Sequence, residues 1–547
     1  MRKFGIYLCY APSVDLRTDG LGRHLGEFLK GASERDDVKF VVACPSWHTA
    51  TLMQLLRSCG LAPDAIDLIA PASPPLLLAA LRIRQARKAR TLPGRRRAGL
   101  RARLHTFLLA AGKRVELRVA STRTIVGGAF WGAVLFLILL AAAFMRKTLD
   151  WLKFLPRLAG RTLRKAIGRI LRACNRLRAP TQVDDTIQLR ETLMERLSRT
   201  MEENEAILLG RLINARKDIA AWYSPTAFWP SFNDLPAPRL MCVPDVVPAE
   251  FPIGFVALEG TGFEKGFSQV ETAIQEGEYF VTYSERTKWE TLVRLYGTAP
   301  ESVFVIRHGA TRLDDLIRLT GFPDNAAATD KFCCTLLRTA LQKDVHQSYV
   351  GLKSNTRIRF IFYASQFRPN KNIITLLRAY EYLLRRRFVG HKLILTGIAR
   401  ESDDITAFIA DRNLRHDVLC LHGLSERELA ACYHLADLAV NPSLSEGGCP
   451  FTFTEAMSVG TPVVMARIQV TEEVITDPQL QAAMLFDPFN WRDVAARIEY
   501  GLLNRDKLFA LEQPFYEQLA QRSWRNVVDD YVAILERIST RKEAIHA

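Results

Sequence analysis

Short apolar segments with the composition of β-strands alternate along most of this chain with patterns typical of helices. Such alternation predicts parallel, doubly wound sheets, because each helix returns the chain to the start of the next parallel strand. The strand-like segments form two groups: 4–11, 38–45, 218–224, 239–246, 279–284 and 302–309, then 357–365, 391–397, 417–423, 436–443 and 461–466. We therefore expect an α/β protein with two Rossmann-like domains. They should face each other across a cleft at the carboxyl ends of the strands, where such sheets bind ligands.

Breaks in this pattern indicate where the domains begin and end. A chain of 547 residues is long enough for roughly two to four domains. The expected division is 1–80 with 200–310 for the first domain, 81–199 for a helical insertion in it, 311–355 for a linker or excursion, 356–515 for the second domain, and 516–547 for a C-terminal helix that packs back on the first.

The ten cysteines follow neither a metal-site pattern nor a disulfide framework. There is no Cys-x-x-Cys pair and no Cys/His cluster with zinc spacing, and Cys333 and Cys334 are adjacent. We expect free thiols in a reducing compartment. No Asp-x-Asp pair stands out as a metal ligand, so we expect no metal.

The positive charge of the chain is concentrated in one segment. The net charge is +16, but residues 82–178 hold 25 Lys and Arg against two acids, Glu116 and Asp150. That segment therefore carries +23, and the rest of the chain carries −7. A basic insertion suits either an anionic membrane surface or a nucleic acid.

The middle of this insertion favours the membrane. Ile125–Met145 holds 21 residues without a charge, and as a helix it would be about 30 Å long, the thickness of a bilayer's hydrocarbon core. The following segment, 148–178, intersperses apolar with basic residues, as in a helix lying among anionic headgroups. A buried core helix is the alternative. Nucleic-acid binding is the weaker rival, because an uncharged helix has no use there.

The position of this segment within the first domain restricts its topology. Strands of one sheet precede and follow it, and one sheet cannot lie on both sides of a bilayer. Basic residues flank it on both sides, and Lys and Arg collect in cytoplasmic loops. We therefore expect an anchor at the cytoplasmic face of the cell membrane rather than a single crossing.

The stretch Asn441–Val464 places a glycine turn before a short helix. Gly447 and Gly448 allow the backbone to approach a ligand closely. Residues 451–459 read as a helix ended by Gly460 and Pro462, and the positive end of such a helix suits a phosphate.

Two carboxylates accompany this turn. Glu446 precedes it and Glu455 lies inside the helix, and each could accept hydrogen bonds from paired hydroxyls. A nucleotide sugar is a ligand that carries both a phosphate and diols. Two solvent-facing acids at a helix start are the alternative interpretation.

These residues carry a resemblance to a known family. PSLSEGGCPFTFTEAMSVGTPVV (442–464) resembles the Glu-containing motif of family-4 retaining glycosyltransferases, which have the GT-B fold (group 1 glycosyl transferases). Three further segments resemble that family's diphosphate, base-flanking and glycine-loop segments: YASQFRPNKNIITLLRAYEYLL (363–384), LHGLSERELAACYHLADLAVNPS (421–443) and TDGLGRHLGEFL (18–29). Weaker similarity extends to 243–252, 281–288 and 305–310.

The resemblance implies roles for individual residues. It implies an acceptor side in the first domain and a donor side in the second. The residues expected to act in catalysis are Lys371, Arg368 and Glu446; those expected to bind the donor are Glu455, Gly447, Gly448, Gly20, Gly22 and Leu424. The donor would be a nucleotide-diphosphate sugar bound as substrate, with no cofactor.

Four departures from the family pattern bear on these roles. Eight residues separate Glu446 from Glu455, where the family usually has seven. Gln366 stands in the place of the diphosphate arginine, which leaves Arg368 to replace it. The usual His-Asp of the first domain reads Pro244-Asp245, and His308 stands where Asn is common.

The expected function is therefore transfer of a hexosyl group, with retention, from a nucleotide sugar to a glycan or lipid-linked acceptor. No nucleic acid is expected as a partner. The alternative is a membrane-anchored scaffold that keeps the fold and has lost activity.

Overall fold

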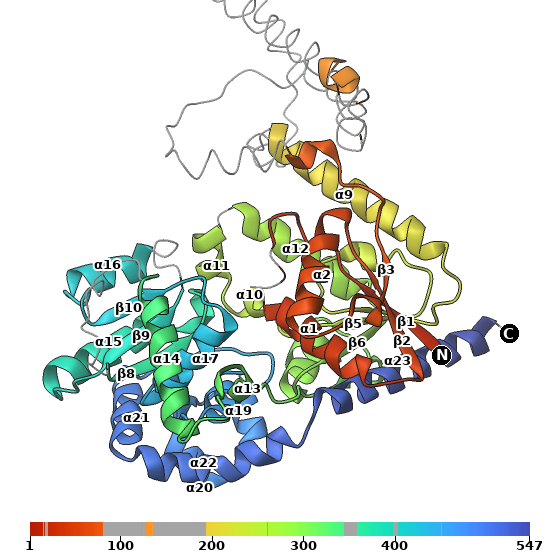
Figure 1. Ribbon diagram of the computed structural model, residues 1–547. Helices are drawn as coiled ribbons and strands as arrows, with labels where there is room; N and C mark the ends of the chain where they lie inside the picture. Colours follow the sequence, from red (N-terminus) through yellow and green to blue (C-terminus); the bar gives the residue numbers. More distant parts are fainter. Residues whose placement is uncertain are drawn as a thin grey trace, which may run out of the picture.

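The computed structural model describes residues 1–14, 16, 20–79, 122, 127, 129–134, 193–259, 261–343, 358–397, 403–449 and 451–546. In this part of the chain, two parallel sheets lie side by side, each covered by helices (Figure 1). Each sheet has its own apolar core. The expected pair of doubly wound, Rossmann-like domains is thus confirmed.

The first sheet has the strand order β3-β2-β1-β4-β5-β6-β7, and all its pairings are parallel. Its strands are β1 (Arg2–Tyr7), β2 (Val38–Ala43), β3 (Asp67–Ile69), β4 (Trp222–Ser224), β5 (Arg239–Cys242), β6 (Tyr279–Thr282) and β7 (Val303–Val305). The helices of this domain include α1 (Gly20–Ser33), α2 (Thr49–Ser58), α9 (Leu193–Asn214), α10 (Val247–Glu250), α11 (Pro252–Glu259), α12 (Thr261–Gln275) and a π-helix (Thr287–Leu295).

The second sheet has the strand order β10-β9-β8-β11-β12-β13, again with parallel pairings. Its strands are β8 (Phe360–Ala364), β9 (Lys392–Thr396), β10 (Val418–Leu421), β11 (Leu438–Asn441), β12 (Val463–Ala466) and β13 (Leu485–Phe486). Its helices include α15 (Ile373–Arg386), α16 (Asp403–Asp411), α17 (Glu426–Leu435), α18 (Phe451–Ser458), α19 (Gln469–Val474), α20 (Pro478–Met484), α21 (Trp491–Leu503) and α22 (Arg505–Ala520).

Every predicted strand segment overlaps an observed strand, usually shorter than predicted. Two strands were missed, β3 and β13, because each has only two or three residues. Both extend their sheets at an edge.

The predicted linker or excursion at 311–355 differs from the structure over its described part, which reaches Lys343. It forms α13 (Asp314–Ile317) and α14 (Asn325–Leu341), and α14 packs on the second domain. Cys333, Leu337 and Leu341 are buried in that domain's core at helical spacing. Because the first half of α14 has no apolar stripe, the sequence did not indicate this packing.

The predicted membrane-associated insertion, 81–199, lies largely outside the described residues, and so does most of Ile125–Met145. Within the described part of the chain, no helix combines the length and the apolar character that a bilayer crossing requires. The insertion rejoins the domain through α9, where Glu205 is fully buried and accepts hydrogen bonds from the backbone N–H and the hydroxyl of Ser46.

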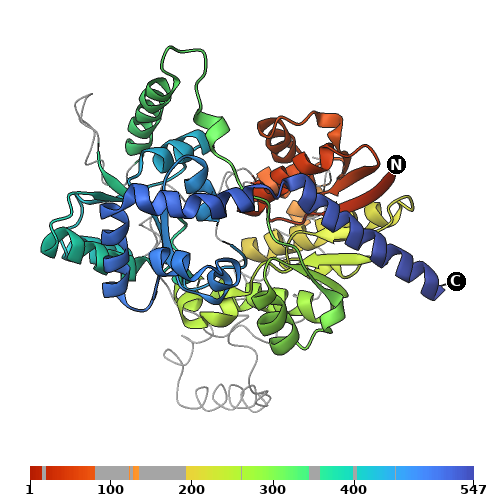
Figure 2. The ribbon, with the colours of Figure 1, turned by 90° about the horizontal axis from the view of Figure 1, so that it is seen from below.

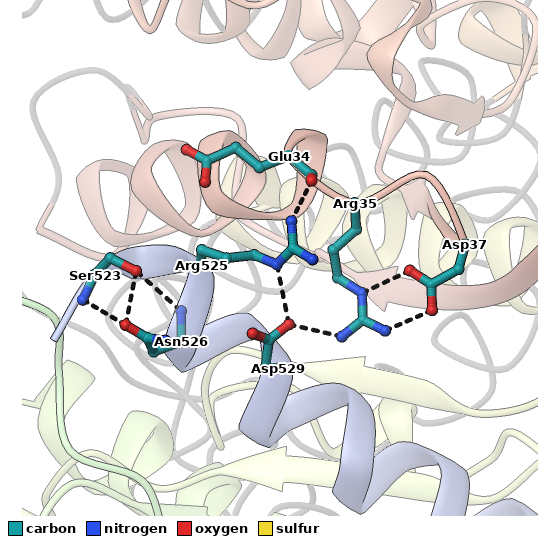
Figure 3. Close-up of polar contacts among 7 residues, drawn as sticks. All are labelled: Glu34, Arg35, Asp37, Ser523, Arg525, Asn526 and Asp529. Carbon is teal, nitrogen blue, oxygen red and sulfur yellow. Dashed lines mark hydrogen bonds and ion pairs between the residues drawn. The ribbon is translucent and has the colours of Figure 1, made fainter.

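The C-terminal helix α23 (Trp524–His546) leaves the second domain and packs along α1 of the first (Figure 2). A Cβ at Gly31 would lie 2.6 Å from the carbonyl carbon of Trp524, so the two backbones touch. Figure 3 shows the polar edge of this contact: Asp529 accepts from Arg35 at 2.7 Å and from Arg525 at 3.1 Å. The chain thus crosses twice between the domains, which links their relative positions.

Candidate active site between the two domains

The two domains meet at the carboxyl ends of their strands. Pro244 follows β5 and Tyr283 follows β6 in the first domain, while Gly447 and Gly448 follow β11 in the second. A Cβ at Gly447 would lie 2.1 Å from the Pro244 carbonyl oxygen, and one at Gly448 would lie 2.9 Å from Tyr283 Cβ. Only glycine permits this approach, so the glycine turn is required for the two domains to come together as they do.

Lys371 and Glu446 form an ion pair at this junction, with Nζ 2.6 Å from Oε1. Lys371 ends a short turn after β8, and Glu446 lies in the loop after β11. Although burial alone lowers the pKa of the lysine, the neighbouring Glu446 carboxylate raises its pKa above the usual value. Lys371 is therefore held as a cation at the junction.

Hydrogen bonds of Asn370 and Asn372 hold the turn that carries Lys371 against the loop that carries Glu446. Asn370 accepts a hydrogen bond from the Leu444 N–H at 2.8 Å through its carbonyl, and its side-chain amide donates to the Ser445 carbonyl at 3.1 Å. Asn372 takes a left-handed conformation (φ 54°) and donates to the carbonyl of Pro442 at 3.1 Å. The sequence therefore fixes the Lys371 turn directly against the Glu446 loop.

Asp245 faces this ion pair from the first domain. Burial and the nearby Glu446 carboxylate raise its pKa, while the cations Lys371 and Arg368 act in the opposite direction. The Asp245 and Arg368 side chains are nevertheless exposed to solvent. Asp245 is therefore a solvent-accessible carboxyl with charges of both signs around it.

The structure places the other predicted site residues at three locations. Glu455 lies inside α18, with 4% of the residue exposed. Gly20 begins α1, and a Cβ at Gly22 would lie 1.8 Å from the Leu16 carbonyl oxygen. Leu424 is partly buried against the second domain's core, just before α17. The structure thus brings together Lys371, Glu446, Gly447, Gly448 and Arg368.

A cluster of aromatic rings beside this junction was not predicted from sequence. His308 lies after β7. The centroid of its ring is 3.8 Å from that of Tyr283 and 4.7 Å from that of Phe451, at the start of α18. His24 and Trp524 complete the cluster. Burial lowers the pKa of His308 well below its usual value, so it is neutral. His308 therefore contributes to the packing between the two domains. In the sequence, its position after β7 was the feature that indicated a place at the domain junction.

Glu473 makes a further contact between the domains. From α19 it accepts hydrogen bonds from the backbone N–H groups of Glu285 and Arg286, at 3.1 and 3.2 Å, just before the π-helix. The Arg286 side chain in turn contacts Gln469 at 2.8 Å. A carboxylate at a helix N-terminus is favourable, so these contacts stabilise the closed arrangement.

The described residues include no group of three His, Cys, Asp or Glu side chains placed to hold a metal ion. Lys371 and Arg368 both supply positive charge close to Asp245 at this junction.

Two facing, doubly wound parallel-sheet domains with their strand ends at a shared junction define the GT-B architecture. HepE from Anabaena, solved in complex with UDP and glucose, shares this fold with a TM-score of 0.52 and 12% identity, covering 98% of this chain and 100% of that one. The N-terminal domain of Candida albicans trehalose-6-phosphate phosphatase gives a TM-score of 0.52 at 12% identity, covering 98% and 97%.

Residues 350–518 match the family model of the group 1 glycosyl transferases. The expected resemblance to that family is thus confirmed. The chain is 28% identical over 218 residues to O-antigen chain mannosyltransferase B of Escherichia coli, covering 39% of this chain and 55% of that protein. It is 30% identical over 193 residues to the MMP alpha-(1->4)-mannosyltransferase of Mycolicibacterium hassiacum, covering 35% and 46%. These matches span about half the length of the curated relatives.

Proposed function

We propose that this chain transfers a hexosyl group, with retention, from a nucleotide-diphosphate sugar to a glycan or lipid-linked acceptor. The observation that carries the proposal is the Lys371–Glu446 pair between the carboxyl ends of two facing sheets. The match of residues 350–518 to the glycosyl transferase model supports it.

In this proposal the donor lies between the domains, with its nucleotide on the second. Lys371 and Arg368 neutralise the diphosphate as it leaves, aided by the N-terminus of α18 and by backbone N–H groups near Gly20 and Gly22. These groups supply the required positive charge, so the reaction as proposed needs no metal.

The remaining site residues position the sugar and the nucleotide. Glu446, with Gly447 and Gly448, holds the sugar, and Glu455 binds the ribose hydroxyls. The acceptor hydroxyl attacks from the face that the diphosphate leaves, and the diphosphate takes its proton. The protein contributes position and charge rather than a covalent intermediate.

We also propose that the enzyme acts at the cytoplasmic face of the cell membrane, in polysaccharide synthesis. The uncharged stretch Ile125–Met145 within the basic segment 82–178 supports this location. The name of the E. coli relative, an O-antigen chain mannosyltransferase, is consistent with an acceptor carried at a membrane.

The test is release of nucleoside diphosphate from a panel of UDP- and GDP-sugars by the purified full chain in detergent, with and without added membrane lipid. We expect release with one donor, stimulated by lipid. No release with any donor would contradict the proposal.

A second candidate function is an inactive, membrane-anchored scaffold. Gln366 in the place of the diphosphate arginine and the eight-residue spacing from Glu446 to Glu455 favour it. Such a scaffold would bind membranes and release no nucleotide in the same assay.

A further inference from the structure

Asp245 occupies a position that the second domain is shaped to accept. A Cβ at Gly447 would lie 3.4 Å from Asp245 Cβ and 2.7 Å from the Pro244 carbonyl carbon. Any side chain at 447 would therefore push the Pro244–Asp245 segment away from the junction. The glycine turn thus brings Asp245 close to the loop that carries Glu446.

Burial, more than any single neighbouring charge, disfavours the charged form of Asp245. It faces Glu446 across the domain junction, and both this neighbour and desolvation disfavour its charged form. Two like charges brought together by closure destabilise the closed arrangement. The cations Lys371 and Arg368 and the Val247 N–H offset part of this penalty, and an amide of the same size would avoid it altogether.

The four charged groups can bind different parts of a nucleotide-diphosphate sugar. Lys371 and Arg368 are cations and suit phosphate oxygens. Asp245 and Glu446 are carboxylates, which repel phosphate and accept hydrogen bonds from hydroxyl groups. Asp245 is exposed, so it is accessible to a ligand at the domain junction.

We propose that Asp245 is a substrate-contacting residue that accepts hydrogen bonds from hydroxyls of the transferred sugar, opposite Glu446. This inference rests on the proposed glycosyl transfer. Because Asp245 belongs to the first domain and Glu446 to the second, the sugar is held from both sides only when the domains are together. The sugar then offsets the repulsion between the two carboxylates by bonding to both.

The test compares Asp245→Asn and Asp245→Ala with wild type. Since a hydrogen bond to a charged group is worth about 10- to 100-fold in binding, kcat/KM for the nucleotide sugar should fall by about that factor. Affinity for free UDP or GDP, measured by calorimetry, should stay within about twofold. The thermal midpoint of Asp245→Asn should equal or exceed that of wild type, because the repulsion with Glu446 is gone.

Asp64→Asn is the matched control, an exposed aspartate beside the edge strand β3, and it should behave as wild type. Unchanged transfer by Asp245→Asn would overturn this inference alone. A lower thermal midpoint with proportionate loss of activity would overturn it in favour of a structural role. No transfer by wild type or by the control would overturn both the proposed function and this inference.

Discussion

Lys371 Nζ lies 2.6 Å from Glu446 Oε1, and this contact joins the turn after β8 to the loop after β11. A diphosphate that binds Lys371 would replace the Glu446 carboxylate as its partner. Glu446 would then be released toward sugar hydroxyls. Glu446 and a bound diphosphate would therefore compete for Lys371, because the lysine cannot pair equally with both anions.

Glu446→Gln tests this relation. Loss of the carboxylate should reduce transfer by about 10- to 100-fold, because the hydrogen bonds of Glu446 to the sugar hydroxyls involve a charged group. Affinity for free UDP or GDP should be retained or improved, because Lys371 no longer has a competing anion. Steady-state kinetics and calorimetry measure the two effects.

The control is Glu428→Gln, which weakens the pair between Lys343 and Glu428 (2.7 Å) in the same domain. Its transfer should remain within a few-fold of wild type. Weaker nucleotide binding by Glu446→Gln would contradict the competition.

Glu473→Ala should loosen the closed arrangement of the domains. It removes the acceptor of the Glu285 and Arg286 N–H groups in the other domain. We expect a larger radius of gyration in small-angle scattering and a raised KM for the donor. Glu472→Ala is the control, because its neighbour Arg467 belongs to the same domain. Identical scattering from both variants would exclude the contact as a determinant of closure.

Tyr531→Ala should destabilise the first domain by about 3–5 kcal/mol, the usual effect of truncating a fully buried aromatic side chain. Tyr531 in α23 is 0% exposed and lies edge-on to Phe28 at 5.2 Å. Tyr531→Phe retains the ring and should lose less than about 1.5 kcal/mol. Urea unfolding checks both, and equal effects would show that packing of α23 on α1 is not what matters.

The lowered pKa of His24 predicts that the protein loses stability in mild acid. Burial lowers its pKa to about 4, from 6.5. Below pH 6.5 the unfolded chain binds a proton that the folded chain excludes, so stability falls as the pH drops from 6.5 toward 4. Since one pKa unit corresponds to about 1.4 kcal/mol, His24 contributes roughly 3 kcal/mol to this loss.

Unfolding midpoints at pH 7 and pH 5 test this effect. The decrease should be smaller in His24→Gln than in wild type, whereas the exposed His416→Gln should follow wild type. An equal decrease in all three proteins would assign the acid sensitivity to other groups.

The fold was largely predictable because its signals are local. Apolar runs such as 391–397 and 417–423 became the buried strands β9 and β10, and Gly460 ends α18 with φ 86° as expected. The edge strands β3 and β13 were missed because they are only three and two residues long. The packing of α14 was missed because its buried apolar residues lie only in the second half of the helix.

The candidate site was predictable residue by residue, but its contacts were not. Lys371 and Glu446 were each identified from the resemblance, yet 75 positions separate them, and no pattern in the sequence indicates that they pair. Asp245 and Glu473 act across the domain junction. Their partners are set by how two separately folded sheets face each other, which periodicity and spacing do not encode.

The most direct test of the central claim is transfer of radiolabelled sugar from the active donor to membrane lipid by wild type, Lys371→Ala and Lys343→Ala. If Lys371 stabilises the leaving diphosphate, Lys371→Ala should lose transfer by about 100-fold or more while it still binds membranes. Lys343→Ala removes the lysine of the Lys343–Glu428 ion pair and should keep transfer within a few-fold of wild type. Transfer by Lys371→Ala at the wild-type rate would contradict the account.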